Sequence, residues 1–155
     1  MITTNIDYPE VFPWPSVDGY KIQHTNMIER SNLDSGRARQ RVRFSKVPST
    51  VNASFFFDTD EQAAAFEAWF RDVLKNGAGW FNCRLKTSIG LGYYVCRFKE
   101  VYEGANPIGI CAWEISAELE IWERPLLPVG SGLFPEYLVE AAILDRAMNE
   151  LWAIN

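Results

Sequence analysis

Residues 51–81 constrain the fold most, because they read as a strand, a capped helix and the start of a second strand. Thr59, with Gln62 three residues later, forms a capping box at the start of the helix. Gly77 can adopt the left-handed conformation that ends a helix. The apolar side chains between these signals recur at the helical period; they are Phe66, Trp69, Phe70, Val73 and Leu74. The sequence therefore predicts one central helix, over about residues 59–75, that packs against strands.

Two other stretches alternate along the chain in the way that strands do, with successive side chains on opposite faces. Residues 37–47 predict a half-buried antiparallel strand that pairs as a hairpin with residues 51–57. One face of this strand carries four arginines, which are Arg37, Arg39, Arg41 and Arg43. Residues 110–124 predict the longest strand, with an apolar face to be buried. Its other face carries an acidic row with a tryptophan at the end, made of Glu114, Glu118, Glu120 and Trp122.

The arginine row and the glutamate row are complementary in charge, and two arrangements follow from this. If the two strands are neighbours, the rows pair across the sheet, and each exposed pair contributes about 0.2–1 kcal/mol. If they lie at opposite edges, successive copies of the protein join head to tail, which is the contact that a closed ring needs. The arginine row alone reads either as a solvated face or as a contact surface for acidic groups on a partner or along nucleic acid.

The pattern along the chain predicts three segments. Residues 1–17 form an arm rich in proline and aromatic residues, which covers its own domain or reaches a neighbouring subunit. Residues 18–125 form a mostly β domain, and residues 126–155 form a linker followed by an amphipathic helix over about residues 136–152. The candidate aromatic anchors for an interface are Phe12, Trp14, Trp122, Phe134 and Trp152.

Composition argues against several functional classes. The net charge of −5 disfavours a protein that binds nucleic acid through bulk positive charge. The three cysteines are widely spaced and His24 is the single histidine, so we expect neither a metal site nor a cofactor. No secretory signal and no apolar run long enough to span a membrane is evident, and the odd number of cysteines fits a reducing cytosol. No catalytic constellation stands out, and we expect a protein that is not an enzyme.

A family resemblance rests on the order of these motifs. The arginine strand RQRVRF at residues 39–44 leads to the phenylalanine strand that ends at Asp58 and to the helix of residues 61–74. A Gly-Trp-Phe junction at residues 79–81 and the long strand of residues 113–124 follow. In this order the chain resembles the minor tail proteins and distal tail proteins of long-tailed bacteriophages. The resemblance covers residues 37–124; the arm and the C-terminal extension look additional to the family pattern.

This resemblance implies a mostly β, α+β fold, either an antiparallel β-sandwich or a small barrel, crossed by the central helix. It implies a homo-oligomeric ring in the virion, between the tail tube and the central hub or fibre, made in the cytoplasm of the bacterial host. Contact with nucleic acid is then expected only if DNA passes through the lumen of the ring. The alternative is a small β-rich enzyme or ligand-binding module, such as a cell-wall hydrolase domain, that uses His24 and the glutamates.

Overall fold

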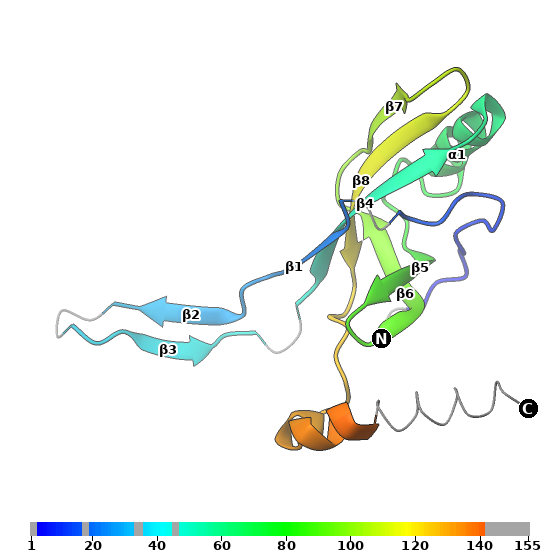
Figure 1. Cartoon of the computed structure of the whole chain (residues 1–155). Coiled ribbons are helices and arrows are strands. Elements are labelled where there is room, and N and C mark those ends of the chain that lie inside the picture. Colours follow the sequence, from blue (N-terminus) through cyan, green and yellow to red (C-terminus); the bar gives the residue numbers. More distant parts are fainter. Residues whose placement is uncertain (1–2, 17–18, 33–35, 45–46, 142–155) are drawn as a thin grey trace, which may run out of the picture. The chain divides into compact units, whose positions relative to one another are not determined.

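The structure is a computed structural model, and its elements are drawn in Figure 1. It describes residues 3–16, 19–32, 36–44 and 47–141. The chain separates into two compact units, Met1–Arg124 and Pro125–Asn155.

Six strands of the first unit form one antiparallel sheet, with the path β1–β4–β8–β6–β5 and with β7 paired to β8 beside this path (Figure 1). The strands are β1 (Lys21–His24), β4 (Ser49–Phe57), β5 (Phe81–Thr87), β6 (Gly90–Phe98), β7 (Glu103–Pro107) and β8 (Trp113–Ile121). The predicted α+β, mostly β fold with antiparallel strands is confirmed. Within the described residues β1 and β5 do not pair, so the sheet stays open and the predicted small barrel is wrong.

Strand β8 is the centre of this sheet. One of its edges pairs with β4 along the whole strand, from Phe57 opposite Trp113 to Ser49 opposite Ile121. Its other edge is shared, because β7 pairs with its first half and β6 pairs with its last three residues. Strand β7 is not among the strands predicted from the sequence, because its residues, EGANP, carry no alternating apolar pattern.

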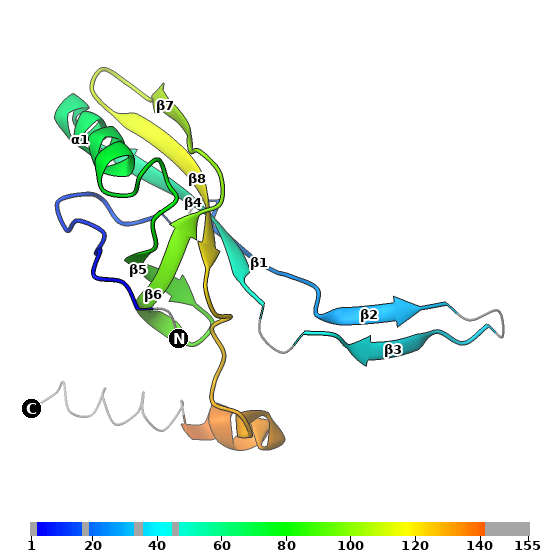
Figure 2. The same cartoon turned by 180° about the vertical axis from the view of Figure 1, so that it is seen from behind.

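Helix α1 (Asp60–Asp72) lies against one face of the sheet (Figure 2). The predicted cap is present, because Thr59 Oγ1 accepts a hydrogen bond from the Gln62 backbone N–H at 3.3 Å. The Gln62 side chain in turn accepts one from the Asp58 backbone N–H at 3.3 Å. The helix ends three residues earlier than predicted, and Gly77 follows with a φ of +89°. A Cβ at this glycine would lie 2.8 Å from the Phe70 ring, so its backbone passes directly over the helix.

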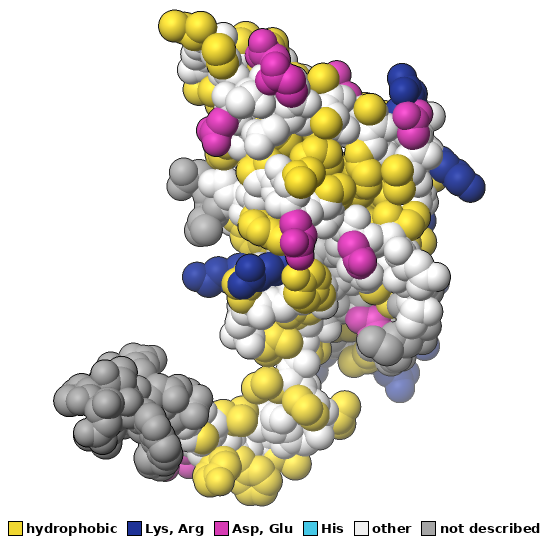
Figure 3. Space-filling view, turned by 90° about the vertical axis from the view of Figure 1, so that its right-hand side faces the viewer, with side chains coloured by type: hydrophobic (Ala, Val, Ile, Leu, Met, Phe, Trp, Pro, Cys, Tyr) yellow, Lys and Arg dark blue, Asp and Glu magenta, His cyan; other side chains and the backbone are white. Residues whose placement is uncertain are grey.

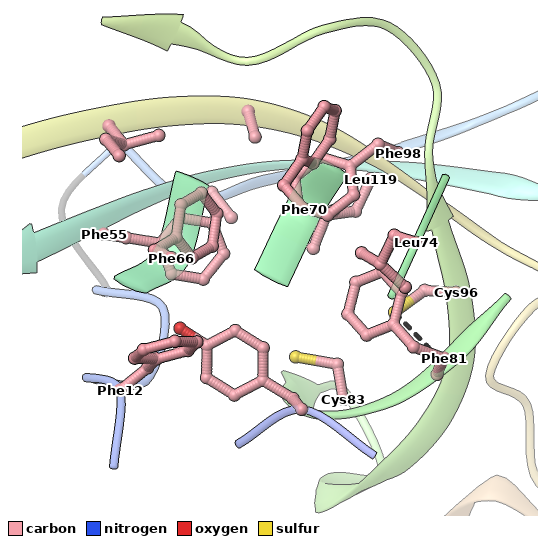
Figure 4. Packing of buried hydrophobic residues seen from close by; sticks show 14 of the residues in the cluster. Phe12, Phe55, Phe66, Phe70, Leu74, Phe81, Cys83, Cys96, Phe98 and Leu119 are labelled. Atoms are coloured by element: carbon pink, nitrogen blue, oxygen red, sulfur yellow. Dashed lines mark hydrogen bonds between the residues drawn. The ribbon is translucent and has the colours of Figure 1, made fainter. Parts of the chain in front are cut away.

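The core lies between α1 and this face of the sheet and is largely aromatic (Figure 4). Alternate residues of β4 and β8 point into it, as the period-two pattern predicts. The Phe66 ring of α1 lies 5.7 Å from that of Phe55 and 5.2 Å from that of Phe57. The side chains that are fully buried include Phe55, Phe57, Phe66, Phe81, Leu74, Leu85, Ile115, Leu119 and Ile121.

The proline-rich arm packs on its own unit. Tyr8 and Phe12 are only 3% and 5% exposed and belong to the core. The arm also extends the sheet, since the Tyr8 N–H bonds to the Asn82 carbonyl at 2.9 Å and the Ser16 N–H bonds to the Ser54 carbonyl at 2.8 Å. The prediction that Phe12 is an interface anchor is therefore wrong, because its ring is buried in the core and leaves no surface for a partner to contact.

The predicted hairpin between the arginine strand and residues 51–57 is also wrong. Strand β4 pairs instead with β1, whose His24 lies opposite Ser49. The arginine strand, β3 (Arg39–Val42), pairs with β2 (Ile28–Ser31), and these two strands form a separate two-stranded sheet. This ribbon is inserted between β1 and β4, so the whole segment is one long hairpin with an interruption between its base and its tip.

In the second unit a short 3₁₀ turn, η1 (Ser131–Leu133), precedes helical residues 135–141. The predicted C-terminal helix is thus seen at its first residues. The remainder of that prediction, residues 142–152, lies outside the described part of the chain.

Replacing Phe12 with alanine tests whether the arm is part of the core. We expect F12A to lower the free energy of unfolding by about 3–5 kcal/mol, because it removes a buried ring and leaves a cavity. The matched control is F134A, whose ring is 69% exposed and whose loss changes stability by less than about 0.5 kcal/mol. Urea unfolding followed by tryptophan fluorescence measures both; equal effects of the two substitutions contradict the arm's place in the core.

Candidate interaction surface

The β2–β3 ribbon is the most exposed ordered element of the first unit. Every residue of β3 is exposed, and β2 is half-buried only at Glu29. The prediction of a half-buried strand is wrong here, since Val42 is 72% exposed and the nearby Phe44 is 51% exposed. Both faces of the ribbon therefore meet solvent.

The two faces of the ribbon differ in chemistry. One face is mixed, because it carries the directly opposed pair Ile28 and Val42 and, two residues along, Arg30 opposite Gln40. The other face is cationic, where Glu29 lies opposite Arg41 and accepts two hydrogen bonds from its guanidinium, at 2.7 and 2.9 Å. A second guanidinium, that of Arg43, reaches the same carboxylate at 3.9 Å.

One carboxylate does not neutralise this face. Residues 27–44 hold five arginines and two acidic residues, in a chain whose net charge is −5. Among the described residues neither Arg37 nor Arg39 has a hydrogen bond or ion pair. The structure thus concentrates positive charge on the ribbon and leaves the rest of the protein acidic. Acidic side chains recur over the face of the first unit drawn in Figure 3, with hydrophobic side chains between them.

The base of the ribbon is held in place by local hydrogen bonds. Thr25 Oγ1 donates to the Pro48 carbonyl at 3.0 Å and so joins the two chain segments where they leave the sheet. The Asn26 side chain accepts from the Ile28 backbone N–H at 2.9 Å and starts β2. The Arg43 N–H bonds to the Met27 carbonyl at 2.8 Å and extends the ladder. These hydrogen bonds hold the two chain segments together at the base of the ribbon, although almost all side chains of β2 and β3 are exposed.

The glutamate row of β8 takes its partners from the neighbouring strand β6 and the segment after it. Glu120 accepts from Arg97 Nε at 2.6 Å, and Glu118 accepts from Lys99 Nζ at 2.8 Å. Glu114 lies on the same strand opposite Phe56. The arrangement in which this row pairs with the arginine row across one sheet is therefore wrong, because the two rows lie in different sheets.

The remaining candidate anchors are distributed over the molecule. Trp122, 39% exposed, packs edge-on against Trp80 with ring centroids 5.1 Å apart, and the Arg97 guanidinium lies 4.6 Å from the centroid of Trp80. Trp14 is half-buried beside the core. Phe134 is exposed in the second unit, and Trp152 lies outside the described residues.

No group of residues in the described chain resembles a reaction centre. His24 Nδ1 lies 2.9 Å from Ser49 Oγ, but Ser49 is 1% exposed and does not present its hydroxyl to a substrate. Desolvation and the nearby Arg124 lower the pKa of His24 below its usual value. Within the described ranges no three His, Cys, Asp or Glu side chains gather as a metal site.

None of the described helices is long and apolar enough to cross a membrane.

Comparison with known proteins adds no relative, because no family model, no curated protein and no solved structure matches the chain.

Sequence reasoning identified the arginines but missed the other half of this surface. It left β2 unassigned, and with it Glu29 and the apolar partner Ile28. The sequence signal for β2 was weak, because its four residues, IERS, are too few to show an alternating apolar pattern. A single alternating strand also does not show whether its apolar side chains meet a core or water.

The exposure of the ribbon predicts fast hydrogen exchange. Opening it breaks only its own pairing, whereas opening β4 disrupts the core. In dilute protein we expect the amides of β3 to exchange roughly 1000-fold faster, or more, than those of β4. Mass spectrometry of peptides from the two strands measures this ratio. Equal protection of β3 and β4 contradicts the free ribbon.

Proposed function

We propose that this chain is a structural protein of a bacteriophage tail tip or baseplate. It acts by contact, forming a homo-oligomeric ring between the tail tube and the central hub or fibre. It is made in the host cytoplasm and is incorporated into the virion. Its sequence resemblance to minor and distal tail proteins supports this assignment, and so does its most exposed surface.

The exposed β2–β3 ribbon is the observation that carries the proposal. An isolated two-stranded sheet is at best marginally stable in water, and its unpaired edges invite pairing with another chain. The exposed Glu29–Arg41 pair contributes less than about 1 kcal/mol and does not compensate. A ribbon that exposes both arginines and apolar side chains is well suited to be covered by a partner, as ring subunits cover one another.

The proposal rests on this surface and on the sequence resemblance, and not on the fold, since mostly β domains host many unrelated functions. The net charge of −5 favours protein contacts over DNA as the main role of the arginines. An enzymatic alternative finds no support in the geometry, because His24 and the glutamates are engaged separately, by Ser49, Arg97 and Lys99.

Quantitative mass spectrometry of purified virions from the encoding phage or prophage tests the function. We expect a few copies of the chain per particle, in a multiple of about three or six, which is the number that a closed ring would give. Complete absence of the chain from virions refutes a structural role.

A shortened chain tests the part played by the ribbon. The hydrogen bond from Thr25 to Pro48 holds the two ends of the insertion together, so residues 27–44 can be replaced by a Gly-Gly linker without opening the sheet. We expect this variant to keep the cooperative unfolding of the first unit and to lose incorporation into virions. The control replaces Ser88 and Ile89, the two residues of the β5–β6 turn, with Asn-Gly and is incorporated normally. Normal incorporation of the ribbon deletion argues against the ribbon as an assembly element.

A further inference from the structure

A groove on the outer face of the six-stranded sheet complements the ribbon in charge. It has a volume of about 310 Å³ and lies on the side of β4 and β8 that faces away from the core. Its lining includes Asn52, Ser54, Ser116, Glu100, Glu103 and Glu118. No lysine or arginine is among its described lining residues.

The polar groups of the groove are arranged by strand register. Asn52 lies opposite Glu118 and Ser54 lies opposite Ser116, so amide, hydroxyl and carboxylate groups share this face. Strand β7 brings Glu103 beside Ser116. Lys99 binds Glu118 at 2.8 Å, while Glu103 has no ion pair among the described residues. The groove thus keeps hydrogen-bond acceptors and a net negative charge.

We infer that the ribbon of one copy of this chain docks on the acidic outer groove of a second copy, with the arginines Arg37 and Arg39 entering between the glutamates. This deepens the proposed function, on which it rests, by naming the two surfaces that would join successive subunits.

Charge and exposure indicate that the groove is occupied by the ribbon of another copy of the chain. The unpartnered guanidinium groups stand on the same chain as the unpartnered carboxylate of Glu103, and guanidinium binds carboxylate with two parallel hydrogen bonds. The arginines of the ribbon are exposed, so they do not occupy the groove of their own chain. The contact is therefore between molecules.

The exposed apolar side chains of the ribbon favour protein over nucleic acid as its partner. Ile28, Val42 and Phe44 are 43%, 72% and 51% exposed, and a phosphate backbone offers such side chains nothing to pack against. Close to the groove β4 exposes Phe56, which is 37% accessible and lies opposite Glu114. An acidic and partly apolar surface can bind both the arginines and the exposed apolar side chains of the ribbon.

The geometry of the contact is heterologous. The ribbon and the groove are different surfaces, so in a ring each copy uses one to bind the copy before it and the other to bind the copy after it, whereas reciprocal exchange of ribbons across a two-fold axis would give a closed dimer. Such head-to-tail contacts close into a ring when the rotation between copies permits, and otherwise extend into a filament. Either product is larger than a dimer.

A charge-swap experiment on the full chain tests this inference. Sedimentation velocity over a range of protein concentrations, in about 0.05 M and about 0.5 M NaCl, measures self-association. We expect assemblies larger than dimers that weaken in high salt. R37E/R39E and E100K/E103K should each weaken association on the order of tenfold or more. Combining all four changes in one chain should restore it, because the charges are then exchanged and not lost.

The matched control for R37E/R39E is K75E/K86E, which makes the same change of charge at two exposed lysines outside both surfaces. It should associate like the parent, and circular dichroism should show that all variants melt alike. A parent that is monomeric at every concentration overturns the inference. So does association that R37E/R39E leaves unchanged, or a combined variant that does not recover.

Three further outcomes separate this inference from its alternatives. If the parent stays monomeric and binds duplex DNA through Arg37 and Arg39, the ribbon is a nucleic-acid surface and the inference is overturned. If the purified chain associates as expected but is absent from virions, the tail function fails while the ribbon–groove contact stands. If virions contain the chain and R37E/R39E is incorporated normally, the function stands and the contact fails.

Discussion

Packing around the Phe66 ring is the interaction on which the first unit depends. This side chain of α1 contacts Phe55 and Phe57 of β4, and it also lies 5.9 Å from Phe12 of the arm and 5.6 Å from Tyr102. Segments that are far apart in sequence therefore share one buried neighbour. Because aromatic rings contribute large buried areas and pack with defined geometry, this cluster fixes the helix on the sheet and the arm on both.

The parts of the fold that sequence could predict are those whose signals are local. The Thr59–Gln62 cap and the alternation of β4 and β8 are each readable within about ten residues, and all three elements are present. The burial of Phe12 depends on where a proline-rich segment packs, which its own sequence does not record. Strand β7 has the sequence EGANP, which is a run of turn-forming residues. It forms a strand because it pairs with one edge of β8, which its own residues do not indicate.

The sequence predicted which charged residues form the candidate site, but not which strands carry them side by side. The sequence left two arrangements open for the arginine and glutamate rows, pairing across one sheet or contact between copies, because matching signs carry no information about which sheet a strand joins. In the structure Glu118 and Glu120 are bound by Lys99 and Arg97, while the arginines stand on the ribbon. The two rows therefore differ in their local partners: Glu118 and Glu120 form ion pairs with side chains of their own sheet, whereas Arg37 and Arg39 form none among the described residues.

The place of the arm also determines the order in which the protein can be completed during synthesis. Residues 3–16 are made early, yet the sheet edge that receives Tyr8 belongs to Asn82. At about 5–20 residues per second the ribosome needs several seconds to make the intervening chain. Through that interval the edge of β5 that pairs with the arm has not been made, so the aromatic side chains of the arm lack their native packing partners on that strand. The earliest part of the first unit to be synthesised is thus among the last to be folded.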